Sequence, residues 1–189
     1  MEDRKTACGN PLFQPDPGRG NDPAGGLGGV LTRQVRPLSP LSHKQSVSHS
    51  ELFNAPAAAV WELLIDWSGI VNWMPDGYIR ELQMEGQGLG AIRHLVTGQG
   101  VKISERLDEI DAPGGRLNLS IIEPLPWGML SYTARAQLDS SGNDQCRLGW
   151  RGTFELPAGG AAAAELAKLL KKSYIKMFEG IRSQLPQAG

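Results

Sequence analysis

The alternation of apolar and polar residues divides most of the chain into short strands followed by one long helix. Residues 47–53 alternate as a short strand. Pro56 then lies at the first turn of a helix expected over 57–66, where its fixed φ suits the helix and its missing N–H costs nothing. A second short helix is expected over 70–73, because Pro75 prevents it from continuing. The pattern therefore predicts two short helices in succession after the first strand.

Six further segments alternate as strands, and short connectors rich in turn-forming residues separate them. They cover residues 78–85, 91–97, 101–110, 116–123, 129–138 and 145–156. Residues 161–185 then form a long helix with apolar residues on one side and lysines on the other. This order predicts an α+β helix-grip fold, in which a curved antiparallel seven-stranded sheet surrounds the long C-terminal helix and the two short helices after strand 1 close one end. A sheet and one helix of this size seldom fill the space between them, so we expect an internal cavity.

Residues 1–45 have a different composition from the rest of the chain. They hold six prolines, seven glycines and one aromatic residue, Phe13. Such a segment cannot bury enough apolar surface to offset the entropy of ordering it. We therefore expect a disordered Pro/Gly-rich tail, followed by a ligand-binding domain over residues 46–186. Residues 23–50 lack acidic side chains, so a targeting role for the tail is one alternative, and a translation start further downstream is another.

Charge and composition exclude several classes of partner. The formal net charge is −1, which gives no electrostatic footprint for nucleic acid or an anionic membrane surface. No apolar run approaches the roughly 20 residues of a membrane span. The two cysteines lie in different contexts, and no His, Cys and carboxylate cluster has metal-ligand spacing. We expect a cytoplasmic protein with no integral membrane segment, no metal and no cofactor.

The hairpin around residues 98–100 supplies the strongest candidate for a functional site. If its loop has three residues, Arg93 lies opposite Glu105 on the neighbouring strand. Both residues lie on the same face of their strands as the neighbouring apolar residues, so both charged side chains are expected to project toward the interior. One interpretation is an ion pair that only holds the hairpin, and the other is a polar anchor for a ligand. A two-residue turn would shift the register and separate them.

Strand parity also selects the large side chains expected to wall the cavity. Together with the two charged residues, the candidate ligand-binding residues are Trp73, Arg93, Leu95, Glu105, Leu119, Ile121, Trp127, Tyr132 and Trp150. Trp127 belongs to the PLPWG connector, where we expect it at the mouth as a movable lid beside the loop 98–100. Ser, His and Asp occur without any paired nucleophile and base, so no catalytic residue is assigned.

From about Ser46 to Leu185 the chain resembles the START/Bet v 1-like superfamily, also called SRPBCC. The resemblance rests on APAAAVWELLIDWSGIVNWMP, GLGAIRHL, ERLDEID and SIIEPLPWGMLSYTARAQL, in that order and spacing. Within it, the chain is most similar to the bacterial polyketide cyclase/dehydrase and lipid-transport group. The resemblance implies the helix-grip fold. In the plant abscisic-acid receptors of this superfamily, the strand residues matching Arg93, Glu105 and Tyr132 line the ligand cavity.

Three functions follow from these observations. We favour a protein that binds or carries a hydrophobic small molecule, such as a lipid, a polyketide or an isoprenoid-like compound, in the cavity. The first alternative is a polyketide cyclase or dehydratase, with Glu105 as base and Tyr132 or Arg93 polarising a carbonyl. Arg93 would lower the pKa of Glu105, which argues against Glu105 as a base at neutral pH. The second alternative is a pocketless interaction module.

Overall fold

The computed structural model describes residues 42–157 and 160–186. Most of the tail expected to be disordered lies outside these residues, and β1 begins at His43, inside the segment assigned to the tail. In chain order the elements are β1 (His43–Phe53), α1 (Ala57–Ile65), α2 (Ile70–Trp73), β2 (Ile79–Glu85), β3 (Ile92–Thr97), β4 (Lys102–Asp111), β5 (Arg116–Ile122), the 3-10 turn η1 (Pro126–Gly128), β6 (Ser131–Ser140), β7 (Cys146–Leu156) and α3 (Ala161–Gln184).

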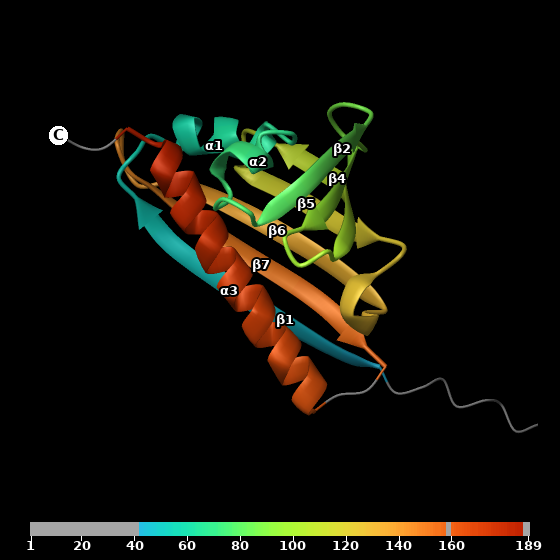
Figure 1. The fold of residues 1–189 in the computed structure, drawn as a ribbon. Helices are drawn as coiled ribbons and strands as arrows, with labels where there is room; N and C mark the ends of the chain where they lie inside the picture. The colour runs from blue at the N-terminus through green and yellow to red at the C-terminus, as the bar shows by residue number, and fades with distance from the viewer. Residues whose placement is uncertain (1–41, 158–159, 187–189) are drawn as a thin grey trace, which may run out of the picture. The chain divides into compact units, whose positions relative to one another are not determined.

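The strands form one antiparallel sheet of seven strands in the order β1-β7-β6-β5-β4-β3-β2. Strands β2 to β7 follow one another as a meander, and β1 pairs with β7 without a break from His43–Leu156 to Phe53–Cys146. The register shifts between Ile79 and Glu81 in β2 and between Leu107 and Glu109 in β4. Such irregularities bend strands, and Figure 1 shows the sheet curving around α3. The predicted helix-grip fold is confirmed.

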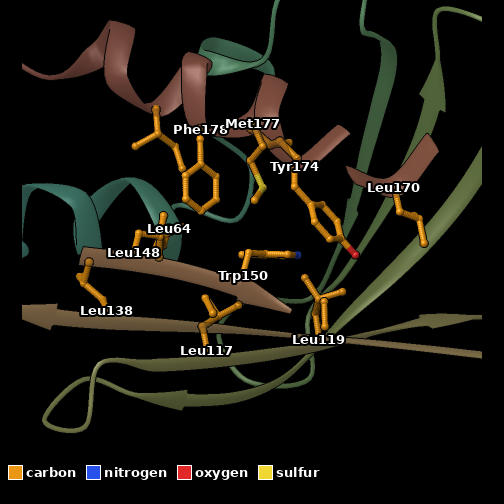
Figure 2. Close-up of a cluster of buried hydrophobic side chains, with 14 of the residues drawn as sticks. Leu64, Leu117, Leu119, Leu138, Leu148, Trp150, Leu170, Tyr174, Met177 and Phe178 are labelled. Carbon is orange, nitrogen blue, oxygen red and sulfur yellow. The ribbon is translucent and has the colours of Figure 1, made fainter. Parts of the chain in front are cut away.

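One face of the sheet is apolar because side chains alternate along each strand. In β7, Cys146, Leu148 and Phe154 are completely buried, while Arg147 and Arg151 between them are exposed. The buried face of the sheet packs against α3, and Figure 2 shows Met177, Phe178 and Tyr174 reaching from that helix toward the strands. None of the described helices is long and apolar enough to cross a membrane.

The backbone of α2 packs directly on α3 at a glycine. A Cβ atom at Gly180 would overlap the carbonyl oxygen of Trp73, the last residue of α2. Gly180 is buried in the interior of α3, where glycine normally weakens a helix by about 1 kcal/mol relative to alanine. The close contact with Trp73 explains why glycine stands there, and it fixes how near the two short helices approach the long one.

We predict that Gly180→Ala destabilises the protein, although the same change in an open helix would stabilise it. The added methyl group must push α2 away from α3, and overpacking of this kind costs about 1–3 kcal/mol. Urea unfolding followed by circular dichroism measures the free energy of unfolding of both proteins. A gain in stability of about 1 kcal/mol, the value set by helix propensity alone, would contradict the prediction.

Candidate ligand-binding cavity

A cavity of about 460 Å³ lies between the sheet and α3. Small-molecule sites in proteins typically measure about 300–1,000 Å³, so the space suits a ligand and not only a few waters. Its walls come from the segment between α1 and β2, from β2 to β7, from η1 and from the middle of α3. The lining side chains are mainly apolar, among them Ile70, Met74, Leu95, Val101, Ile103, Ile121, Leu170 and Met177.

Arg93 and Glu105 form a buried ion pair on one wall of this cavity. The register places Arg93 opposite Glu105, which confirms the pairing expected from a three-residue loop. Arg93 Nε donates to Glu105 Oε2 at 2.6 Å, and the two side chains are 6% and 16% exposed. Arg93 Nη1 also donates to the carbonyl oxygen of Trp67 at 3.2 Å, and its guanidinium carbon lies 3.6 Å from the centroid of the Trp67 ring. The cation is therefore neutralised and stacked before any ligand arrives.

Two tyrosine hydroxyl groups meet between the sheet and α3. Tyr132 from β6 and Tyr174 from α3 share a hydrogen bond of 2.8 Å, and both line the cavity. Gly152 in β7 makes room for them, because a Cβ atom there would overlap the Tyr174 hydroxyl and crowd that of Tyr132. A pair of polar groups can therefore lie within an otherwise apolar core.

Both tyrosines keep their protons at neutral pH. Burial is the largest cause that raises the pKa of Tyr132 well above its usual range, and the Tyr174 hydroxyl and the charge of Glu105 raise this pKa further. Burial likewise raises the pKa of Tyr174 to about 12, and the Glu105 charge adds to this effect. Because both groups stay neutral, each keeps its hydrogen, and the pair has one hydrogen left to donate beyond the bond that the two hydroxyl groups share.

The structure places most of the predicted site residues on this cavity. Arg93, Leu95, Glu105, Ile121, Trp127, Tyr132 and Trp150 all line it. Trp127 lies in η1, is 40% exposed and has a positive φ of 55°, and Gly98 and Gln99 of the hairpin loop also line the cavity. The geometry of these side chains supports the strand-parity argument, and their role in binding a ligand stays a prediction.

Two predicted wall residues lie elsewhere. Trp73 is buried under α3 beside Gly180, and the α2 side chains that reach the cavity are those of Ile70 and Met74. The expectation for Trp73 is wrong because a helix of one turn offers too few residues to show which side faces inward. Leu119 has the inward parity but is not among the residues that line the cavity, and Figure 2 shows it within the cluster of buried side chains.

Several lining residues were not among the predicted site residues, and seven of them belong to α3, between Leu169 and Met177. Tyr174 lies four residues from both Leu170 and Phe178, so helical spacing could have placed it on the buried side. Tyr78 donates to Ser173 at 2.5 Å, which joins the start of β2 to α3 across the cavity edge. Lys172 and Lys176 were assigned to the solvent side of the helix, yet parts of both side chains border the cavity.

The chain has the helix-grip fold of the START/Bet v 1-like superfamily. Residues 44–185 match the family described as "Polyketide cyclase / dehydrase and lipid transport". Because the match covers most of the chain, this protein belongs to that family. Among proteins of curated function, none matches the sequence.

Solved structures share the fold at low sequence identity. The chain is similar to the ZhuI aromatase/cyclase from Streptomyces sp. R1128, with a TM-score of 0.66 and 18% identity over 75% of this chain and 93% of that one. Norcoclaurine synthase from Thalictrum flavum has a TM-score of 0.63 and 17% identity over 76% and 94% of the two chains. A solution structure from Thermobifida fusca has a TM-score of 0.58 and 26% identity over 67% and 83%.

We predict that Arg93→Ala strongly destabilises the protein. It leaves the Glu105 carboxylate inside the sheet without its cation, and breaking a buried pair from one side costs about 3–5 kcal/mol. Arg106→Ala is the matched control, because Arg106 pairs with Asp108 in the same hairpin at 2.6 Å but is 48% exposed. It should cost less than about 1 kcal/mol in urea unfolding. Equal losses for the two variants would contradict the assignment.

The raised tyrosine pKa values predict a loss of stability in alkaline solution. Tyrosines in the unfolded chain titrate near 10, whereas in the folded protein the pKa of Tyr174 is about 12 and the pKa of Tyr132 lies well above its usual range. Their contribution is therefore complete below pH 10 and is lost as the pH rises through 12. Between pH 9 and pH 11 we expect them to account for a loss of about 1–3 kcal/mol. Urea unfolding at the two pH values should show a loss that is larger in the wild type than in the Tyr132→Phe/Tyr174→Phe double variant by about this amount, since the buried Cys146 thiol, whose pKa burial also raises, contributes to both proteins.

Proposed function

We propose that this protein binds or carries an uncharged hydrophobic small molecule in the cavity between the sheet and α3. The observation that supports it best is the cavity itself, which measures about 460 Å³ and has a mainly apolar lining with a few polar groups on its walls. Sites of this kind bury most of a ligand's surface, and the polar groups fix its orientation. Membership of a family that includes lipid-transport proteins agrees with this function.

The nature of the walls favours a compound with a rigid, flat apolar body. Trp150 and Tyr174 present aromatic rings to the cavity, and Ile103 and Ile121 supply aliphatic walls. A polyketide or isoprenoid-like molecule combines such a body with a few oxygen atoms, as the wall combines apolar surface with hydroxyl groups. The similar Streptomyces structure is an aromatase/cyclase, which also makes an aromatic polyketide a reasonable choice for the first ligands tested.

Catalysis of the cyclase or dehydratase type has less support. Such a reaction needs a general base with an available lone pair near the reacting carbon. Glu105 is held by Arg93 at 2.6 Å, and the two tyrosines keep their protons to high pH. These groups are suited to orienting a ligand through hydrogen bonds and not to removing its protons.

We predict that the neutral apolar dye N-phenyl-1-naphthylamine binds in the cavity, with a rise in its fluorescence on titration. Ile103→Trp fills part of the cavity and should weaken binding by about tenfold or more, since the larger side chain takes the ligand's place. Ile110→Trp is the matched control, because Ile110 lies on the same strand but is exposed. It should leave binding unchanged.

Two results would count against the proposed function. One is the absence of binding by the dye and by a panel of lipids and aromatic polyketides, combined with native mass spectrometry that finds no co-purifying molecule. The other is dye binding that Ile110→Trp weakens as much as Ile103→Trp does, because the dye would then lie on the surface.

A further inference from the structure

Three tryptophans have buried indole N–H groups that find no hydrogen-bond partner in the described part of the chain. They are Trp67, Trp73 and Trp150. Trp67 lies under the Arg93 guanidinium, and Trp73 lies against α3 away from the cavity. Among the three, Trp150 alone lines the cavity, and it is only 7% exposed. A buried donor without a partner is unfavourable, so one that faces a cavity calls for an explanation.

The Trp150 indole lies beside the tyrosine pair. Its ring centroid is 6.4 Å from that of Tyr174, and Figure 2 shows the indole nitrogen and the Tyr174 hydroxyl at the same end of the two rings. Burial dominates the rise in the pKa of Tyr132, and the nearby Trp150 N–H opposes this rise slightly. The two groups do not reach hydrogen-bonding geometry. Three polar groups from β6, β7 and α3 therefore meet at one place on the wall.

The Trp150 N–H has no hydrogen-bond partner in the described part of the chain, and the tyrosine pair has one hydrogen to spare. The two hydroxyl groups share one hydrogen bond, which uses one of their two hydrogens. The other hydrogen and the Trp150 N–H have no acceptor among residues 42–157 and 160–186. Both donors are thus available to one oxygen atom that enters from the cavity.

We propose that Trp150 and the Tyr132–Tyr174 pair form a subsite for an uncharged oxygen acceptor, a carbonyl or ether oxygen, on the hydrophobic ligand. This inference rests on the proposed function, because it concerns the same cavity. An uncharged oxygen fits better than a carboxylate, since the groups that meet here are neutral donors and the cation on the cavity wall, Arg93, is already paired with Glu105 at 2.6 Å. The apolar body of the ligand would then extend from the subsite along the aliphatic walls.

A pair of probes of matched shape tests the subsite. 2-Acetylnaphthalene carries a carbonyl oxygen, and 2-isopropenylnaphthalene has a methylene group in its place. We expect the ketone to bind the wild type about tenfold more tightly than the alkene, because only the ketone satisfies the Trp150 donor. In a ¹⁵N-labelled protein the ketone should also move the Trp150 indole N–H signal downfield, whereas the alkene should not.

Two variants separate the subsite from general effects of removing an indole. Trp150→Phe should reduce the ratio of ketone affinity to alkene affinity to less than about twofold, because both probes lose the same apolar contact with the indole and only the ketone loses a donor. Trp73→Phe removes an equally unpartnered N–H outside the cavity, so it should keep the full preference. The ¹⁵N spectra of the wild type test the subsite without any variant, because the ketone should move the indole N–H signal of Trp150 and leave that of Trp73 in place as an internal reference.

The possible results distinguish this inference from the proposed function. Equal binding of the two probes would overturn the subsite and leave a hydrophobic binder in place. A ketone preference that persists in Trp150→Phe, or a Trp150 signal unmoved by the ketone, would also overturn it. If neither probe binds, the proposed function is lost together with the subsite.

Discussion

The buried charge of Arg93 is the constraint on which the arrangement of the cavity depends. An unpaired guanidinium in an apolar interior is very unfavourable, so its partners must come together when the chain folds. They are Glu105 on the next strand and the carbonyl group and ring of Trp67 between α1 and α2. One side chain thereby ties the register of the β3–β4 hairpin to the position of the two short helices. The same ion pair then forms part of the cavity wall.

Glycine decides where α3 approaches its neighbours closely and where it leaves space. At Gly180 the backbone of α2 lies directly against the helix, and nearby Phe178 packs on Phe53 with ring centroids 5.7 Å apart. That end is closed. Nearer the start of α3, Gly152 on the sheet has no side chain, which leaves room for the hydroxyl groups of Tyr132 and Tyr174. Beyond these hydroxyl groups, the side chains of the sheet and of α3 leave the cavity between them. The cavity lies along the stretch of α3 between Leu169 and Met177.

Much of this arrangement could be predicted from the sequence, since strand parity and loop length are local properties. A three-residue loop was enough to place Arg93 opposite Glu105, and alternation was enough to turn Tyr132 and Trp150 inward. Trp73 could not be placed in the same way, because one helical turn has no period from which to infer a buried side. The meeting of Tyr132, Trp150 and Tyr174 could not be predicted either. It depends on how α3 lies across the sheet, which no local pattern specifies.

The polar groups inside the cavity have in common that each is already held in one protonation state. Arg93 and Glu105 neutralise each other, and burial keeps Tyr132 and Tyr174 neutral far above physiological pH. A cavity with these groups offers hydrogen-bond donors at fixed places on its walls. Under the proposed function, these donors would recognise where the oxygen atoms of a hydrophobic molecule lie. Such chemistry suits selective binding, in which the apolar walls supply affinity and the donors decide which molecule is retained.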